Sequence, residues 1–462
     1  MKLTLEPAAK AAALIVSVVL FMALLDEAVL VTALPSIARA FGVPPVSLAL
    51  SMSVYLTTMV AFLPISGWLS ERYGARRILI MGIAGFALTS LLCALCRSFW
   101  PFIIARAAQG IAGAIMTSVG RQVVLQVTKR EELVTALNII TIPMLVAPTL
   151  GPAVGGAIVT YTHWSWIFYL NLPFALGAMF FAWKYIPPLQ GDATRRLDVV
   201  GAGLTAVALI LILVGIDQMG IAGRFAGGVA LLAAGLSVGA LALRHLQHAP
   251  QPLVSLAPMR DPIFRVTAIT GGGIIRMPIR AMSFILPLMF QLALGFPPLI
   301  AGALLLALNG GDLIFKLVVP RILARFGFRT SLLASGLVCI AAIALGLSFH
   351  AGSSYGWIMA VIAIGGMGRS VLFTGISAVG FIKMEQSQMG AANVLMNTNL
   401  QLTSALSVSV TALILQLVSQ SYDRAVPNLW DFHFTLVALT LIALIGWWKL
   451  RALPADAGRV MA

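Results

Sequence analysis

The chain has 462 residues, of which 60% are hydrophobic and only 10% are charged, whereas a soluble domain has about 45–50% apolar and about 25% charged residues. This composition excludes a soluble globular protein and indicates an integral membrane protein. In a soluble protein, a net charge of +15 would suggest that nucleic acid is a partner. In a membrane protein it points instead to basic residues gathered on the cytoplasmic side, so we expect no nucleic-acid partner.

Apolar blocks long enough to cross a bilayer as helices follow one another along the chain, separated by Gly, Pro and basic residues. No connection between them is long enough for a separate soluble domain. We therefore predict an all-α polytopic membrane protein with fourteen transmembrane helices, over residues 11–33, 46–69, 77–96, 99–121, 133–160, 165–187, 198–217, 222–244, 264–292, 297–320, 329–349, 354–381, 389–420 and 431–450.

The positions of the basic residues predict the orientation. With the N-terminus in the cytoplasm, 21 of the 30 Lys and Arg residues fall on the cytoplasmic side and four on the other side, which favours two cytoplasmic termini. Five basic residues and four acids lie within the predicted helices. Charges inside a bilayer are costly and usually face the bundle interior or a wet cavity, so these are the first candidates for function: Arg106, Arg276, Arg280, Lys316, Arg369, Asp26, Glu27, Asp217 and Asp312.

One loop sequence occurs twice. GWLSERYGARR (67–77) lies between the second and third predicted helices, and PRILARFGFRT (320–330) lies between the tenth and eleventh. Two halves that carry the same loop indicate parallel repeats. We therefore predict a six-helix bundle over residues 1–190, two inserted helices over 191–250, and a second six-helix bundle over 251–462.

The first of these loops resembles the loop motif of the major facilitator superfamily, in which an acid and basic residues latch the inner side of the bundle. Glu71 stands where the family usually has Asp, and Ala75 replaces a usual basic residue. The resemblance implies an inner gate latch formed by Gly67, Glu71, Arg72, Gly74 and Arg76. The alternative is a plain topological anchor of basic residues.

Two further segments resemble motifs of the same superfamily. RAAQGIAGA (106–114) resembles the motif with an intramembrane arginine, here Arg106, which is thought to assist proton transfer in the family. APTLGPAVGG (147–156) resembles the antiporter motif of exporters. Its small residues let a neighbouring helix approach closely, and its proline bends the helix. The motif residues are Gly151, Pro152, Gly155 and Gly156.

The first predicted helix narrows the resemblance. LDEAVLVTALP (25–35) resembles the LDxTIVNVALP signature of the fourteen-helix drug:proton antiporters of the EmrB/QacA type, and WSWIFYLNLP (164–173) resembles a second run of that branch. Ala28 and Val31 depart from the usual Thr and Asn. The resemblance implies the major facilitator fold, with two six-helix bundles and two extra helices between them.

Four residues are candidates for proton coupling. Asp26 is the leading carrier, with Arg106 as its partner, and Glu27 and Asp312 are further candidates. Glu27 lies about 100° further round the helix than Asp26, so only one of the two acids can face a given side. From the family match we expect Asp26 to face the cavity. The alternative is that Asp26 is a fixed ion pair that never titrates.

The C-terminal half carries its own charges. Arg276 and Arg280 share a helix face, and Asp312 and Lys316 are spaced for an i,i+4 ion pair. Asp312 either pairs with Lys316 alone, neutralises Arg276 or Arg280 across the cavity, or serves as a second proton site. Arg369 contacts substrate, snorkels toward the membrane surface or pairs with a carbonyl. The candidates for the substrate cavity are Arg276, Arg280, Lys316, Arg369, Tyr55, Asn393 and Asn397.

These observations predict a proton-coupled antiporter that exports small organic, amphipathic compounds from the cytoplasm by alternating access. An importer or facilitator of the same superfamily is the alternative. An enzyme is not expected, because the five histidines are scattered and no connection is long enough for a soluble domain. The sequence has no P-loop, so ATP is not the expected energy source. We expect no metal or cofactor, the proton motive force as energy source, and a bacterial inner-membrane location. We also expect a monomer, to which a periplasmic adaptor could bind. The excess of intramembrane bases favours anionic, zwitterionic or neutral amphipathic substrates.

Overall fold

The computed structural model describes residues 6–128, 132–189, 191, 198–249, 255–382, 384, 388–424 and 426–454. The described chain consists of helices and contains no strand. The helices are α1 (Pro7–Phe41), α2 (Ala49–Tyr73), α3 (Ala75–Leu95), α4 (Phe99–Val127), α5 (Leu133–Tyr161), α6 (Trp166–Tyr169), α7 (Asn171–Tyr185), α8 (Val199–Met219), α9 (Phe225–His248), α10 (Pro262–Arg265), α11 (Gly272–Leu288), α12 (Pro298–Phe315), α13 (Val319–Phe326), α14 (Phe328–Leu345), α15 (Tyr355–Ile382), α16 (Met389–Ser421) and α17 (Leu429–Leu450).

Thirteen helical segments of the described chain are long and apolar enough to cross a membrane. The fifth predicted span corresponds to α5, a helix of 29 residues whose described apolar part, Val146–Tyr161, is shorter. With α5 included, each of the fourteen predicted spans has its helix, and the predicted all-α polytopic fold is confirmed. The first helix is longer than predicted. Its 35 residues extend about 50 Å, beyond the roughly 30 Å hydrocarbon core of a bilayer.

A glycine with positive φ occupies the same place in both copies of the loop sequence. Gly74 joins α2 to α3 with φ of 91°, and Gly327 joins α13 to α14 with φ of 75°. Only glycine adopts positive φ at little cost, which accounts for the matching glycine in each loop. We call the face of the molecule where α1 begins and α17 ends the terminal face. Both of these loops lie on it, because an even number of spans returns the chain to the same side.

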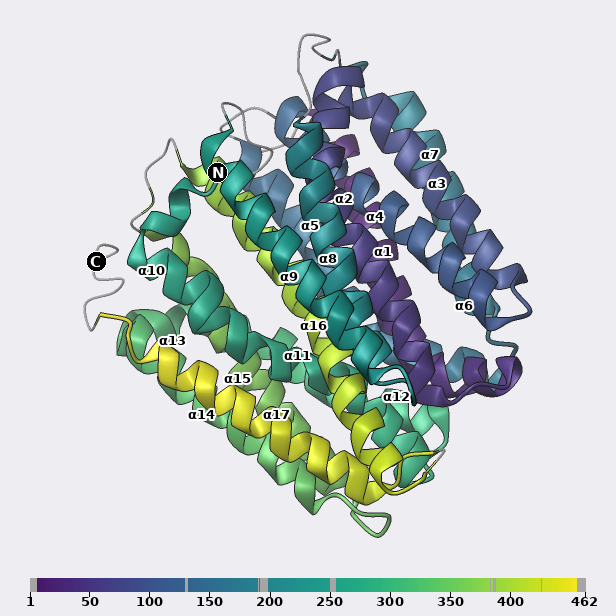
Figure 1. Cartoon of the computed structure of the whole chain (residues 1–462). Coiled ribbons are helices and arrows are strands. Elements are labelled where there is room, and N and C mark those ends of the chain that lie inside the picture. The colour runs from purple at the N-terminus through teal and green to yellow at the C-terminus, as the bar shows by residue number, and fades with distance from the viewer. Residues whose placement is uncertain are drawn as a thin grey trace.

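The helices form two groups that meet along seams (Figure 1). Helices α1 to α5 pack together with α7, and α11 to α17 form the second group. The two groups meet where α5 packs against α12 and where α2 packs against α16, which we call the α5–α12 seam and the α2–α16 seam. The inserted helices α8 and α9 form a closely packed hairpin, and α8 lies along both α2 and α16.

Candidate functional site

A cavity of about 840 Å³ lies between the two groups of helices. Its lining residues come from α1, α2, α4 and α5 of the first group and from α11, α12, α15 and α16 of the second. On α2 the lining runs from Met52 to Glu71, close to the end of the helix at the terminal face. The cavity therefore opens toward the terminal face, and on α1 its lining ends at Val31, well past the middle of the helix.

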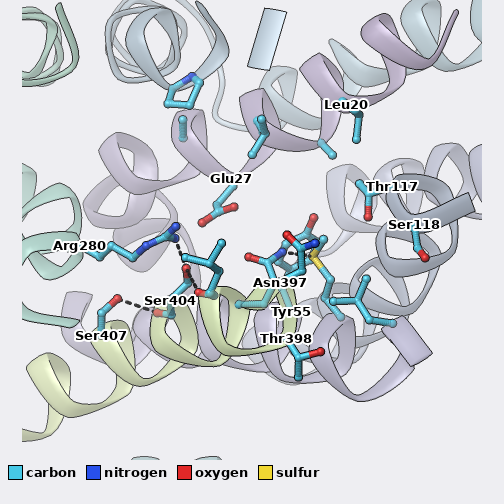
Figure 2. A pocket seen from close by; sticks show the side chains of 18 of the residues that line it. Leu20, Glu27, Tyr55, Thr117, Ser118, Arg280, Asn397, Thr398, Ser404 and Ser407 are labelled. Carbon is cyan, nitrogen blue, oxygen red and sulfur yellow. Dashed lines mark hydrogen bonds between the residues drawn. The ribbon is translucent and has the colours of Figure 1, made fainter. Parts of the chain in front are cut away.

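The lining is mainly apolar but carries eight charged residues. Apolar walls with a few polar groups are typical of sites for small organic ligands. Figure 2 shows how the central polar side chains point into this space. The charged residues of the lining are Glu27, Glu71, Arg121, Asp198, Arg280, Asp312, Lys316 and Arg369.

Glu27, and not Asp26, is the acid of α1 that lines the cavity. The expectation that Asp26 faces the cavity is therefore wrong. Since the two residues differ by about 100° around the helix, turning Glu27 toward the cavity places Asp26 inside the first group of helices. Glu27 is half-buried and forms neither a hydrogen bond nor an ion pair with another described residue.

Asp26 is instead buried in an ion pair with Arg106 of α4, with 2.7 Å between Oδ2 and Nη1. Gln109, one turn further along α4, accepts a hydrogen bond from Arg106 Nη1 at 2.6 Å. Asn171 of α7 donates to Asp26 Oδ1 at 2.6 Å and to Ser90 of α3 at 2.9 Å. We call Asp26, Arg106, Gln109, Asn171 and Ser90 the buried charge centre. It satisfies most of the polar atoms that the ion pair brings out of water.

Tyr55 of α2 separates this buried charge centre from the cavity. The Arg106 guanidinium lies 4.3 Å from the centroid of the Tyr55 ring, within the range of a cation–π contact, and Tyr55 also lines the cavity. The close packing depends on glycine in the arginine motif. A Cβ atom on Gly110 would lie 2.2 Å from the Tyr55 carbonyl oxygen, so a larger residue there would push α4 away from α2.

A second group of charges forms part of the cavity wall in the C-terminal half. Arg369 of α15 forms an ion pair with Asp312 of α12 at 3.0 Å and donates to Asn309 Oδ1 at 2.9 Å. Lys316 lies 3.9 Å from Asp312. We call Asp312, Arg369, Lys316 and Asn309 the cavity charge centre. Asp312 therefore pairs with Arg369 as well as Lys316, and the proposed pairing with Arg276 or Arg280 is wrong.

Arg276 and Arg280 of α11 have different surroundings. Arg276 is fully buried, donating to Ser377 at 2.9 Å and to the Phe373 carbonyl at 3.3 Å. Arg276 does not line the cavity, so the prediction that it is a cavity residue is wrong. Arg280 does line the cavity and donates to Ser404 of α16. Its Nε atom is buried and has no partner among the described residues.

Of the other cavity candidates, Lys316, Arg369, Tyr55 and Asn397 line the cavity. The side chain of Asn393 lies outside the part of the chain that the structure describes.

The residues assigned to the latch lie around the mouth of the cavity. Gly67 and Glu71 are part of its lining. Arg72 lies over the rings of Trp68 and Tyr73, and Arg76 donates to the Trp183 carbonyl at the end of α7. Gly74 packs so closely that a Cβ atom there would lie 2.3 Å from the Leu189 carbonyl oxygen. These contacts tie the α2–α3 loop to the chain that follows α7.

The glycines of the antiporter motif lie at two helix contacts of α5. Gly151 and Gly155 face α1, where added Cβ atoms would meet Ala28 and Val29 at 2.4 Å. Gly156 faces the other half, because a Cβ atom there would lie 2.4 Å from the Pro298 carbonyl oxygen of α12. The Pro152 carbonyl in turn packs against Gly302 of α12. Small residues thus bring the backbones together along the α5–α12 seam.

Sequence reasoning did not assign roles to Gln109, Asn171 and Ser90. A signal was available for Gln109, because it is three residues after Arg106 and thus on the same face of the helix. Asn171 is a polar residue within an apolar run, and such residues usually hydrogen-bond to other helices. No sequence feature indicated that its partner is Asp26, 145 residues away.

Comparisons with known proteins agree with this architecture. The sequence model of the Major Facilitator Superfamily matches residues 16–408. The multidrug resistance protein MdtD of Citrobacter koseri is 32% identical over 414 residues, covering 88% of this chain and 86% of the relative. The protein of the same name from Klebsiella pneumoniae is 32% identical over 448 residues, covering 95% and 93%.

Solved structures show the same fold. The human organic anion transporter MFSD10 superposes with a TM-score of 0.62 at 16% identity, covering 96% of this chain and all of that one. The partially occluded, inward-open xylose transporter XylE of E. coli gives a TM-score of 0.60 at 12% identity, covering 95% and 99%. The chain therefore belongs to the major facilitator superfamily and is a multi-pass membrane transporter rather than an enzyme.

Proposed function

We propose that this transporter exports small amphipathic organic compounds in exchange for protons, driven by the proton motive force without a cofactor. The observation that carries the proposal is the cavity between the two halves and the carboxylate of Glu27 that lines it. Among the described residues, this carboxylate has no partner. The names of the MdtD relatives support multidrug substrates.

The size and lining of the cavity support an organic substrate. Its volume of about 840 Å³ lies within the usual range of about 300–1,000 Å³ for small-molecule sites. Aromatic and aliphatic residues such as Met52, Tyr55 and Phe284 form much of the wall.

Packing on the side opposite the terminal face supports alternating access. The α5–α12 seam is closed by backbone contacts at Gly156 and Gly302, and Gln291 of the second half donates to the Thr32 carbonyl at 3.1 Å. At the α2–α16 seam the hydroxyls of Ser53 and Ser409 are hydrogen-bonded at 2.8 Å. Opening the cavity toward that side requires these contacts to separate while the mouth at the terminal face closes.

Competition at Glu27 supplies the coupling. A carboxylate that binds either a proton or a positively charged substrate group cannot bind both, and such competition is what antiport requires. Asp26 is held by Arg106 behind Tyr55, so in this conformation Glu27 exchanges protons with the cavity. Asp26 takes part only in a conformation that opens the buried charge centre.

We place the protein in the bacterial inner membrane with both termini in the cytoplasm, so that the cavity opens to the cytoplasm here. The basic residues near the terminal face support this orientation. We propose a monomer as the transporting unit, because the cavity is formed within one chain. Binding of a periplasmic adaptor is a separate proposal, and a pull-down from membranes tests it.

The test uses purified protein in proteoliposomes that contain a pH-sensitive dye, with an imposed pH gradient and a panel of organic cations, anions, zwitterions and neutral amphipaths. Wild-type protein is expected to move protons when a substrate is added, and Glu27→Gln is expected to lose this movement. Glu27→Asp, which keeps the carboxylate, serves as the matched control and is expected to retain part of it.

Unchanged proton movement in Glu27→Gln contradicts the role of Glu27. Proton movement in the direction of the substrate, rather than against it, identifies an importer. Substrate equilibration without any proton movement identifies a facilitator. The Asp26→Asn variant, made in parallel, tests whether the buried acid is also required.

A further inference from the structure

We infer that the cavity contains a two-pole site for zwitterionic amphipaths, in which Glu27 binds the cationic group and Arg280 binds the anionic group. The inference rests on the proposed function for the direction of transport, but the binding preference that it predicts is measured separately.

The two residues come from opposite halves and enter the same space. Glu27 lies on α1 and Arg280 on α11, and both side chains point into the cavity (Figure 2). Both side chains line the same cavity, and they form no ion pair with each other. A ligand can therefore lie between them and contact both.

Both groups have unused hydrogen-bonding capacity. Among the described residues Glu27 has no hydrogen-bond partner. Arg280 donates one hydrogen bond, to Ser404, and its Nε atom is buried without a partner. A carboxylate accepts hydrogen bonds from an ammonium group, and the planar guanidinium donates in parallel to a carboxylate or phosphate. The two poles thus match an amine and an acidic group.

The other charges of the cavity are already engaged. Asp312 pairs with Arg369 and lies near Lys316. Nearer the mouth, Asp198 pairs with His245, and Glu71 and Arg121 have interactions of their own. Within the described lining, Glu27 and Arg280 are therefore the two opposite charges that a ligand can engage without breaking an existing ion pair.

Closure of the cavity favours a ligand that carries both a positive and a negative charge. When water leaves the site, a charge without a partner is strongly unfavourable. A simple cation satisfies Glu27 but leaves Arg280 unpaired, and a simple anion does the reverse. A zwitterion satisfies both, while the apolar wall formed by residues such as Val31, Phe284 and Phe373 holds its hydrophobic part.

The test compares four forms of one fluorescent compound on detergent-purified, full-length protein. Nε-dansyl-lysine is a zwitterion, its methyl ester is a cation, its Nα-acetyl derivative is an anion, and the acetylated methyl ester is neutral. All four share the same aromatic body, so differences in affinity report on the charged ends. The change in dansyl emission on binding gives the dissociation constant of each.

Wild-type protein is expected to bind the zwitterion about tenfold or more tightly than the other three forms, since each charged pole contributes a charge-assisted hydrogen bond. Equal affinity for all four forms, or tightest binding of the cation, overturns the inference.

Two variants assign the poles. In Glu27→Gln the zwitterion is expected to bind no better than the anion, and in Arg280→Gln it is expected to bind no better than the cation. Glu27→Asp and Arg280→Lys keep the charges and are expected to restore the preference. Each variant is first checked by size-exclusion chromatography, and a preference that survives both Gln variants overturns the assignment.

Failure of the two-pole site can be told apart from failure of the antiporter proposal. Proton exchange driven equally well by simple cations, without a preference for the zwitterion, leaves the antiporter proposal standing and removes the two-pole site. Preferential binding of the zwitterion without proton exchange does the opposite.

Discussion

Each half of the molecule carries an arginine on its fourth main helix, paired with an acid, but the two pairs differ in their surroundings. In the first half Arg106 and Asp26 are fully buried and surrounded by Gln109, Asn171 and Tyr55. In the second half Arg369 and Asp312 form part of the cavity wall, with side-chain exposures of 10% and 21%.

The difference in burial determines what each ion pair contributes to the stability of the protein. A buried pair contributes little net stability, but removing one partner leaves a charge without compensation. The buried charge centre therefore behaves as a fixed unit that holds α1, α4 and α7 together. The cavity charge centre depends less on any single partner, because Asp312 lies beside both Arg369 and Lys316.

The largest effect is expected for Arg106→Gln. The substitution leaves the Asp26 carboxylate buried without its cation, and we expect a loss of about 3–5 kcal/mol in stability. Thermal unfolding of the purified protein, followed by size-exclusion chromatography, measures it. The double variant Asp26→Asn/Arg106→Gln removes both charges and is expected to recover part of the loss. Equal melting temperatures for Arg106→Gln and wild type contradict a buried charge centre.

Tyr55→Ala is expected to open the buried charge centre to the cavity. Removing the ring deletes buried packing, at a cost of about 3 kcal/mol, and exposes Arg106 from the cavity side. A cysteine introduced at Ser90, in a background without native cysteines, reports the change. We expect a small maleimide to label it in Tyr55→Ala protein but not with Tyr55 present. Tyr55→Phe is the control, and labelling in that background is inconsistent with the ring as a barrier.

Arg369→Gln is expected to cost less than Arg106→Gln, about 1–2 kcal/mol, because Asp312 is partly exposed and keeps Lys316 and water as partners. The same thermal unfolding assay compares the two variants directly. A loss as large as that of Arg106→Gln shows that the buried charge centre and the cavity charge centre contribute equally to stability.

Lys316→Gln is expected to have the smallest effect on stability, below about 1 kcal/mol. Its ammonium lies 3.9 Å from Asp312 and its side chain is 36% exposed, and such pairs contribute little. The melting temperature is expected to lie close to that of wild type. A decrease comparable to that of Arg369→Gln means that Lys316 contributes as much as Arg369 to holding Asp312.

The sequence was sufficient to predict the helices and part of the site. Long apolar blocks have one plausible state in a bilayer, so the fourteen spans could be located. Arg106 and Asp26 could be proposed as partners because an intramembrane charge needs an opposite one. Their burial away from the cavity could not be predicted, because periodicity places Asp26 and Glu27 on different faces without showing which face the cavity adjoins.

Partners across long separations were also beyond the sequence. The i,i+4 spacing of Asp312 and Lys316 suggested a local pair, whereas the shorter contact is with Arg369, 57 residues further along the chain. That contact depends on the packing of α12 against α15. Likewise, Arg276 and Arg280 share a helix face, yet the packing of α15 and α16 buries the first and leaves the second in the cavity.

The position of α8 makes the two seams unequal. It packs against both α2 and α16, and Gln420 of α16 donates to the Gly220 carbonyl at the end of α8. The helices α5 and α12 pack against each other and against helices of their own halves. Lipid tails therefore meet the inserted hairpin on one flank of the molecule and the junction of the halves directly on the other. The inserted hairpin therefore covers the α2–α16 seam and leaves the α5–α12 seam without such a cover among the described helices.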